Sequence, residues 1–211
     1  MKFLVLLCFF LDAFGIAKAQ TKTDTFSIRI HVSSGNISEG EFVTYIDKKG
    51  NDLKIVYSFR DSVSKAYYKS PLVKELIQTS WLYDRTRSNP KLYEIDRILD
   101  SLKIKNSYYS KDSLLLIASR NAGFINLLEK IISTPKELLE NREATKKAAV
   151  LDGANYSFII ETNKEKKYVY AYPFLDPIIH PLLYQLYTEV QNIYRKEKHN
   201  NFLDKMKTLS W

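Results

Sequence analysis

The alternation of apolar and polar positions near residue 30 predicts the first strand of the chain. Between residues 26 and 32 every second residue is apolar, a pattern typical of a strand with one buried face. These apolar positions are Phe26, Ile28, Ile30 and Val32. Residues 41–46 and 53–59 flank the polar stretch 47–52, DKKGND, whose composition is typical of a turn. We therefore expect an antiparallel three-stranded meander in this part of the chain.

Two runs rich in β-branched and aromatic residues flank the polar break TNKE at residues 162–165. They predict a β-hairpin over residues 155–172, in which Ile160 lies opposite Lys167. Because side chains alternate between the two sides of a strand, each face collects its own set of residues. The expected core face carries Tyr156, Phe158, Ile160, Val169 and Ala171. The opposite face carries Asn155, Ser157, Ile159, Tyr168, Tyr170 and Tyr172.

Three prolines occupy positions typical of the first turn of a helix. Pro71 follows Ser70 and Pro90 follows Asn89, each a capping residue, and Pro181 precedes a long amphipathic stretch. Apolar residues recur with helical spacing behind each proline, which indicates one buried stripe per helix. The stripes are Leu72, Val73, Leu76, Ile77 and Trp81; Leu92, Ile95, Leu99 and Leu102; and Leu182, Leu183, Leu186, Tyr187, Val190, Ile193 and Tyr194.

Further helices are predicted between residues 110 and 148. Ser110 is a candidate cap for a helix through Ile117, and the apolar pattern resumes over residues 124–132. The sequence TPKE at residues 134–137 has the form of a capping box, so it predicts a helix that continues to about Ala148.

The order of elements is strands, helices, strands and a final helix. Without alternation of single strands and helices, this order predicts an α+β fold with an antiparallel sheet. We expect the meander and the hairpin to share that sheet, because an isolated hairpin is only marginally stable. No repeat or linker divides residues 20–211, so a single domain is expected.

The N-terminal 19 residues have the features of a signal peptide. Lys2 is followed by the apolar run 3–11, and Ala17-Lys18-Ala19 fits the small-x-small cleavage pattern. The run is too short to span a bilayer, and no transmembrane segment is expected after it. The sequence thus predicts a mature chain, Gln20–Trp211, that is secreted or periplasmic.

Loss of the leader removes the only cysteine, Cys8, so the mature chain can form no disulfide and has no thiol nucleophile or thiolate ligand. The mature chain keeps 30 basic and 23 acidic residues, a net charge of +7. This excess favours anionic neighbours, such as an anionic envelope component or an acidic protein. Charges of both signs are mixed along most of the chain, and nucleic acid is not expected as a partner.

Motifs that carry catalysis or cofactor binding are missing. The chain has six glycines and neither a phosphate-binding glycine loop nor a Gly-x-Ser-x-Gly elbow, so no cofactor is expected. Asp176 and His180 are four residues apart, as are Asp96 and Asp100. No third group can be assigned to either pair, so they are interpreted as polar loop or surface residues and no metal site is expected. The same interpretation covers His31, His199, Glu39 and Glu41.

The tyrosine face of the hairpin is the best candidate for binding. The chain has 15 tyrosines, and Tyr168, Tyr170 and Tyr172 share this face with Ser157. Such rings stack on sugars, bases or protein side chains. The alternative is that a helix covers the face, because both faces of a sheet are often covered in α+β domains.

The sequence is consistent with two functions. The first is a non-enzymatic exported binding protein that engages a protein partner or an anionic envelope component, which the export signal, the basic charge and the missing motifs favour. The second is an exported hydrolase of unfamiliar type, whose carboxylates and histidine are brought together only by folding.

Overall fold

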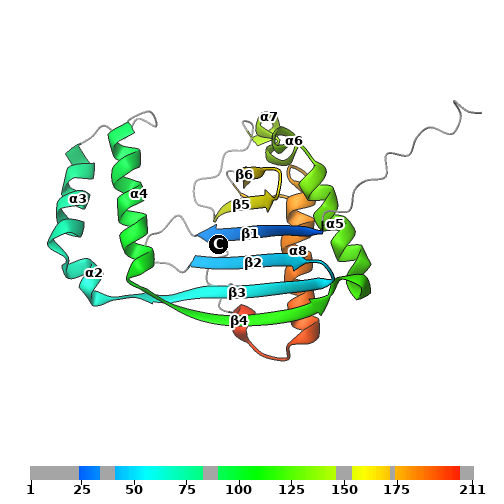
Figure 1. Cartoon of the computed structure of the whole chain (residues 1–211). Helices are drawn as coiled ribbons and strands as arrows, with labels where there is room; N and C mark the ends of the chain where they lie inside the picture. The colour runs from blue at the N-terminus through cyan, green and yellow to red at the C-terminus, as the bar shows by residue number, and fades with distance from the viewer. Residues whose placement is uncertain (1–23, 34–40, 83–89, 146–153, 172–173, 205–211) are drawn as a thin grey trace, which may run out of the picture.

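The computed structural model describes residues 24–33, 41–82, 90–145, 154–171 and 174–204. Its centre is a six-stranded antiparallel sheet in the order β4-β3-β2-β1-β5-β6 (Figure 1). The strands are β1 (Thr25–Ser33), β2 (Glu41–Lys49), β3 (Asp52–Val63), β4 (Ser107–Ile117), β5 (Asn155–Thr162) and β6 (Lys166–Ala171). The helices are α2 (Lys65–Lys69), α3 (Pro71–Leu82), α4 (Pro90–Lys105), η1 (Ala118–Asn121), α5 (Ala122–Ser133), α6 (Lys136–Glu140), α7 (Arg142–Thr145) and α8 (Pro181–Glu197).

The predicted α+β fold is confirmed, including the single sheet shared by meander and hairpin. Strand β1 pairs with β2 on one side and with β5 on the other, so Ile28 lies between Ile46 and Ile160. The hairpin has the predicted register, with Ile160 opposite Lys167. A two-residue turn joins β2 to β3, and Gly50 adopts a φ of 59°, a conformation that glycine tolerates without steric cost.

Helices α5 and α8 pack on one face of the sheet and close the core. Figure 1 shows α8 behind the strands, with α5 beside it. The stripe predicted for α8 supplies four fully buried side chains: Leu183, Leu186, Val190 and Tyr194. They meet the predicted apolar face of the strands, including Ile28, Ile55 and Phe158, in one cluster. Burial of each such side chain stabilises the fold by about 1.5–3 kcal/mol.

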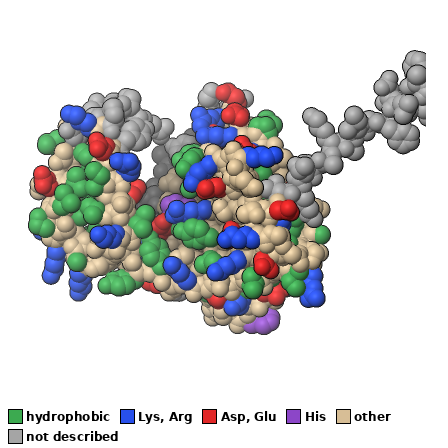
Figure 2. Space-filling model, viewed as in Figure 1, with side chains coloured by type: hydrophobic (Ala, Val, Ile, Leu, Met, Phe, Trp, Pro, Cys, Tyr) green, Lys and Arg blue, Asp and Glu red, His purple; other side chains and the backbone are tan. Residues whose placement is uncertain are grey.

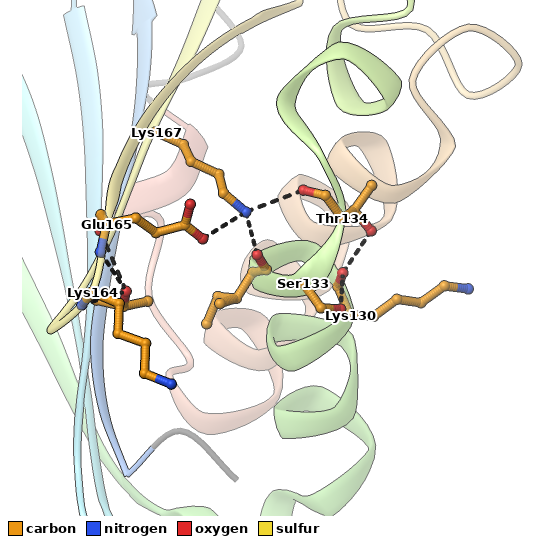
Figure 3. A network of polar contacts seen from close by, with 8 residues as sticks. Lys130, Ser133, Thr134, Lys164, Glu165 and Lys167 are labelled. Carbon is orange, nitrogen blue, oxygen red and sulfur yellow. Dashed lines mark hydrogen bonds and ion pairs between the residues drawn. The ribbon is translucent and has the colours of Figure 1, made fainter. Parts of the chain in front are cut away.

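Lys167 is a charged residue on the core face of β6. The carbonyl groups at the C-terminal end of α5 stabilise its positive charge there. Its Nζ donates hydrogen bonds to the carbonyl oxygens of Ile132 and Thr134 and lies 2.9 Å from the carboxylate of Glu165 (Figure 3). The last carbonyls of a helix lack partners within the helix and carry a partial negative charge. The ammonium group of Lys167 donates hydrogen bonds to these carbonyl groups, and the contact links the hairpin to α5.

The segment from Ser110 to Ile117 is a strand and not the predicted helix. It forms most of β4, which pairs along the length of β3 with Leu114 opposite Ile55. A short apolar run such as LLLI fits either a helix or a strand by pattern alone. The unpaired edge of β3 decides the outcome, because a strand there satisfies the backbone groups of that edge.

The helix predicted from residue 134 toward Ala148 begins close to the predicted position, at Lys136, but it is interrupted at Asn141 and is not one continuous helix. Helix α5 ends at Ser133, because Thr134 adopts an extended backbone conformation with φ −76° and ψ 130°, and the short helix α6 stops at Glu140. Asn141 then adopts a φ of 43°, a left-handed conformation that terminates helices, and α7 follows it. The side chain of Asn141 donates a hydrogen bond to the carbonyl of Ile179, which holds this break in place. Residues 146–148 lie outside the described residues.

Helices α2, α3 and α4 form an arm at one end of the sheet (Figure 1). Helices α3 and α4 begin at Pro71 and Pro90, as predicted. The apolar stripe of α3 remains largely uncovered, because Val73 is buried whereas Trp81 is 71% exposed.

A polar network anchors β4 to the end of α8. The carboxylate of Asp112 accepts hydrogen bonds from the Tyr194 hydroxyl at 2.5 Å and from Lys198 Nζ at 3.1 Å. The Tyr194 ring packs edge-on against Tyr57, whose hydroxyl donates to the carbonyl of Val190 at 2.8 Å. The hydrogen bond from Tyr194, joined by that from Lys198, lowers the pKa of Asp112 from 3.8 to about 2, against a smaller opposing effect of burial.

We predict that Asp112→Asn lowers the free energy of unfolding at pH 7 by about 1–2 kcal/mol, a value reduced for solvent screening of this partly exposed group. A carboxyl group whose pKa is lowered by folding stabilises the protein above its unfolded-state pKa, and the effect disappears as the pH falls through its folded-state pKa. The difference between wild type and variant should therefore shrink between about pH 4 and pH 2.

Urea denaturation at a series of pH values measures this difference. Asp52→Asn, at an exposed position at the start of β3, is the control and should change stability by less than about 0.5 kcal/mol. A difference between wild type and Asp112→Asn that stays constant down to pH 2 would contradict the assignment of the network.

Candidate functional site

On the side of the sheet opposite α5 and α8, no helix of the described residues covers the part of the face that lies away from the helical arm. We call it the open face and define it by the outward residues Ser27, Arg29, Tyr45, Asp47, Lys54, Val56, Ser113, Leu115, Ser157, Ile159, Tyr168 and Tyr170. Several of its large side chains are exposed, among them Leu115 at 75% and Tyr45 at 41%. Figure 2 shows hydrophobic and basic side chains interspersed over this side of the molecule.

The predicted tyrosine face of the hairpin is part of this surface. Tyr168 is 47% exposed and Tyr170 is 52% exposed, so no helix in the described part of the chain covers them. Ser157 lies directly opposite Tyr170 on the neighbouring strand. Tyr172 lies outside the described residues. The alternative of a covering helix is thus wrong for Tyr168 and Tyr170, and their role in binding stays a prediction.

The strand register extends this tyrosine face into a row across the sheet. Tyr168 of β6 lies opposite Ile159 of β5, which lies opposite Arg29 of β1, which lies opposite Tyr45 of β2. Neighbouring strands are 4.7–4.9 Å apart, so the two tyrosines are separated by about 14 Å. Each ring has a cation above it: Lys166 lies 5.8 Å from the Tyr168 centroid, and Arg29 lies 5.4 Å from that of Tyr45.

A shallow depression of about 320 Å³ lies beside Tyr45 in the centre of the open face. It is lined by Ser27, Ile28, Arg29, Tyr45, Ile46, Asp47, Lys54 and Val56. An aromatic ring, two cations and one carboxylate therefore converge on a single hollow. Sequence reasoning missed it because Arg29, Tyr45 and Lys54 come from three strands whose register was not known.

A buried polar cluster lies on the same side of the sheet, next to the helical arm. Glu41 is only 4% exposed, and its carboxylate is 2.7 Å from His31 Nε2 and 2.7 Å from a guanidinium nitrogen of Arg60. The hydroxyl of Tyr109 lies 3.5 Å from the carboxylate of Glu41. Lys103 on α4 has a favourable charge–charge interaction with the same carboxylate. Sequence reasoning placed His31 and Glu41 among ordinary polar residues, and only the β1–β2 register brings them together.

The charges around Glu41 keep it ionised despite its burial. Burial alone would raise the pKa of this carboxyl, but the contact with His31 and the charges of Arg60 and Arg29 outweigh it and hold the pKa below its ordinary value. A carboxylate in contact with one imidazole nitrogen also fixes the orientation of the ring. The side chain of His31 remains 31% exposed, so a molecule at this surface can contact the imidazole ring.

Two of the remaining candidates from the sequence, Asp176 and His180, have structural roles. Asp176 accepts hydrogen bonds from the backbone N–H groups of Ile178 and Ile179. His180 is buried, its Nε2 lies 3.1 Å from the carbonyl oxygen of Glu140, and burial lowers its pKa. Asp96 and Asp100 are exposed on α4, and Glu39 lies outside the described residues.

Within the described ranges, no group of three histidine, cysteine, aspartate or glutamate residues is arranged to hold a metal ion. None of the helices in the part of the chain that the structure covers is both long and apolar enough to cross a membrane. Comparison of the chain with protein-family models, with curated proteins and with solved structures gives no significant match.

We predict that Glu41→Gln lowers the free energy of unfolding at pH 7 by about 2–4 kcal/mol. The substitution removes the charge that compensates Arg60 in a buried setting, and breaking such a pair costs far more than breaking an exposed one. Asp47→Asn on the same strand is the matched control, because its ion pair with Lys49 is exposed and should contribute less than about 0.5 kcal/mol.

Urea denaturation of both variants measures the two differences. Equal, small losses for Glu41→Gln and Asp47→Asn would contradict the structural importance of the cluster.

Proposed function

We propose that this chain is an exported binding protein that contacts its partner through the open face of the sheet. The observation that carries the proposal is the exposure of Tyr168 and Tyr170 on a face that also exposes Tyr45 and Leu115. A soluble chain rarely leaves large aromatic and aliphatic side chains grouped on one surface unless that surface meets another molecule. Tyrosine suits such a role, because it offers a large rigid contact area and a polar hydroxyl.

The N-terminal sequence supports export. Its basic start, its apolar run and Ala17-Lys18-Ala19 are features of a cleaved leader, which places the mature chain in the periplasm or outside the cell. The partner would then be a protein or an anionic component of the envelope, since the mature chain carries a net charge of +7. The intact mass of the exported protein tests this step and should correspond to residues 20–211.

The double variant Tyr168→Ala/Tyr170→Ala should bind at least about tenfold more weakly to an envelope fraction of the source cells, because aromatic contacts contribute most of the energy of many interfaces. Its melting temperature should stay within about 2 °C of wild type, because both side chains are exposed. Sedimentation of labelled mature protein with the envelope fraction measures binding, and calorimetry measures stability.

The matched control is Tyr108→Ala/Tyr184→Ala, which removes two exposed tyrosines outside the open face. This control should bind as wild type does. Unchanged binding by the Tyr168→Ala/Tyr170→Ala variant would remove the proposal. A fall in its melting temperature of many degrees would instead make these residues part of the core.

One observation favours a second function, that of an exported hydrolase. His31 and Glu41 are in contact at 2.7 Å, and the carboxylate orients the imidazole as in general-base catalysis. Ser157 stands opposite His31 in the β1–β5 register, so a hydroxyl lies on the adjoining strand. In this function Glu41 positions the ring of His31, and His31 accepts a proton from a water molecule or a hydroxyl group.

If the hydrolase function holds, the mature protein should cleave a chromogenic ester or phosphoester, and His31→Gln should reduce kcat at least about a hundredfold, the usual contribution of a general base. The pH profile of wild-type kcat/KM should lose its acidic limb in the variant. Asp47→Asn should leave the rate unchanged. The absence of turnover on both substrate classes, or turnover that His31→Gln leaves intact, would leave only the binding function.

A further inference from the structure

The depression in the open face is lined by Arg29, whose guanidinium group lies over the ring of Tyr45. The Nε atom of Arg29 is buried and has no hydrogen-bond partner within the described chain, and Arg29 forms no ion pair with any described carboxylate. A buried donor without a partner costs free energy that folding has to offset. The residue as a whole is partly exposed and lines the depression, so an acidic group that enters the depression meets the positive charge of Arg29.

A second cation reinforces the positive charge of the depression. Lys54 of β3 is exposed, lines the same hollow and lies opposite Asp47 in the strand register. The carboxylate of Asp47 lies 3.5 Å from Lys49, so a further cation compensates it. The depression thus has an excess of positive charge over the single acidic side chain in its lining.

Aromatic rings lie on either side of Arg29 along the row that crosses the sheet. The ring of Tyr45 is 41% exposed beside Arg29, and that of Tyr168 is 47% exposed about 14 Å away on β6. Tyrosine rings present a flat apolar surface on which sugar rings stack, and guanidinium groups bind carboxylates through two parallel hydrogen bonds. An extended chain of sugar rings with carboxylate groups matches this alternation of ring, cation and ring.

We propose that the depression binds the carboxylates of an acidic polysaccharide. Arg29 and Lys54 pair with one carboxylate, while Tyr45 and Tyr168 stack on sugar rings of the same polymer. This proposal rests on the proposed binding function and names its ligand class. A polyanion without sugar rings would use only the two cations, and a neutral polysaccharide would use only the tyrosines.

The test uses the mature protein and three soluble polymers: polygalacturonate, polyglutamate and neutral dextran. Isothermal titration calorimetry or fluorescence titration should show polygalacturonate bound roughly tenfold or more tightly than either other polymer. Its affinity should fall as salt is raised from about 50 to about 200 mM, because pairing with a polyanion releases counterions. If polyglutamate binds with equal affinity, the site recognises negative charge alone and not sugar rings, and the proposal is overturned.

Variants locate the binding in the depression. Lys54→Gln and Arg29→Gln should each weaken polygalacturonate binding roughly tenfold. Tyr45→Leu, which keeps an apolar side chain but removes the ring, should weaken it roughly three- to tenfold. Lys196→Gln removes the same charge from α8, on the opposite side of the sheet, and should change the affinity less than about twofold. Because Lys54 is exposed, Lys54→Gln stays informative even if Arg29→Gln fails to fold.

The outcomes separate this proposal from the proposed function. If polygalacturonate does not bind, or binds equally well to Lys54→Gln, the acidic-polysaccharide site is excluded. The proposed binding function is tested separately: weaker binding of the Tyr168→Ala/Tyr170→Ala variant to the envelope fraction supports it, and unchanged binding contradicts it.

Discussion

The pairing of β1 with β5 is the constraint on which the rest of the structure depends. It joins the N-terminal meander to a hairpin more than 100 residues later in the chain, with Ile28 opposite Ile160. Each strand group alone would expose an apolar face that it could not bury. Their union produces one continuous core face for α5 and α8 and, on the reverse side, one continuous open face. The tyrosines of β6 and the cations of β1 and β3 lie on the same surface only because of this pairing.

Among the described residues, the helices are placed unevenly about the sheet, so part of one face is exposed to solvent. The chain places α5 and α8 on one side of the sheet, whereas α2, α3 and α4 form an arm at its end (Figure 1). Many α+β proteins cover both faces of a sheet, and a covered face would have made Tyr168 part of the core. The open face instead keeps aromatic rings and cations exposed side by side, a composition suited to recognition of another molecule.

Charged groups at buried or partly buried positions lie where separate elements of the fold meet. Lys167 joins the hairpin to the end of α5, Asp112 joins β4 to the end of α8, and Glu41 joins the strands β1, β2 and β3 beside the arm. Each charge is compensated by helix carbonyls or by opposite charges, which makes its burial tolerable. The Glu41 cluster differs from the other two because it leaves a histidine partly exposed, and this exposure is what gives the second proposed function its basis.

The sequence by itself determined the fold class, the strands of the meander, the hairpin register and the starts of α3, α4 and α8, because local periodicity and proline placement encode them. Only the tertiary structure decided that Ser110–Ile117 pairs as a strand, that Tyr168 is exposed, and that Arg29, Tyr45 and Lys54 line one depression. The contact of His31 with Glu41 was likewise decided only by the tertiary structure. These outcomes depend on which strands become neighbours and on which face a helix packs, and no local pattern of residues carries that information.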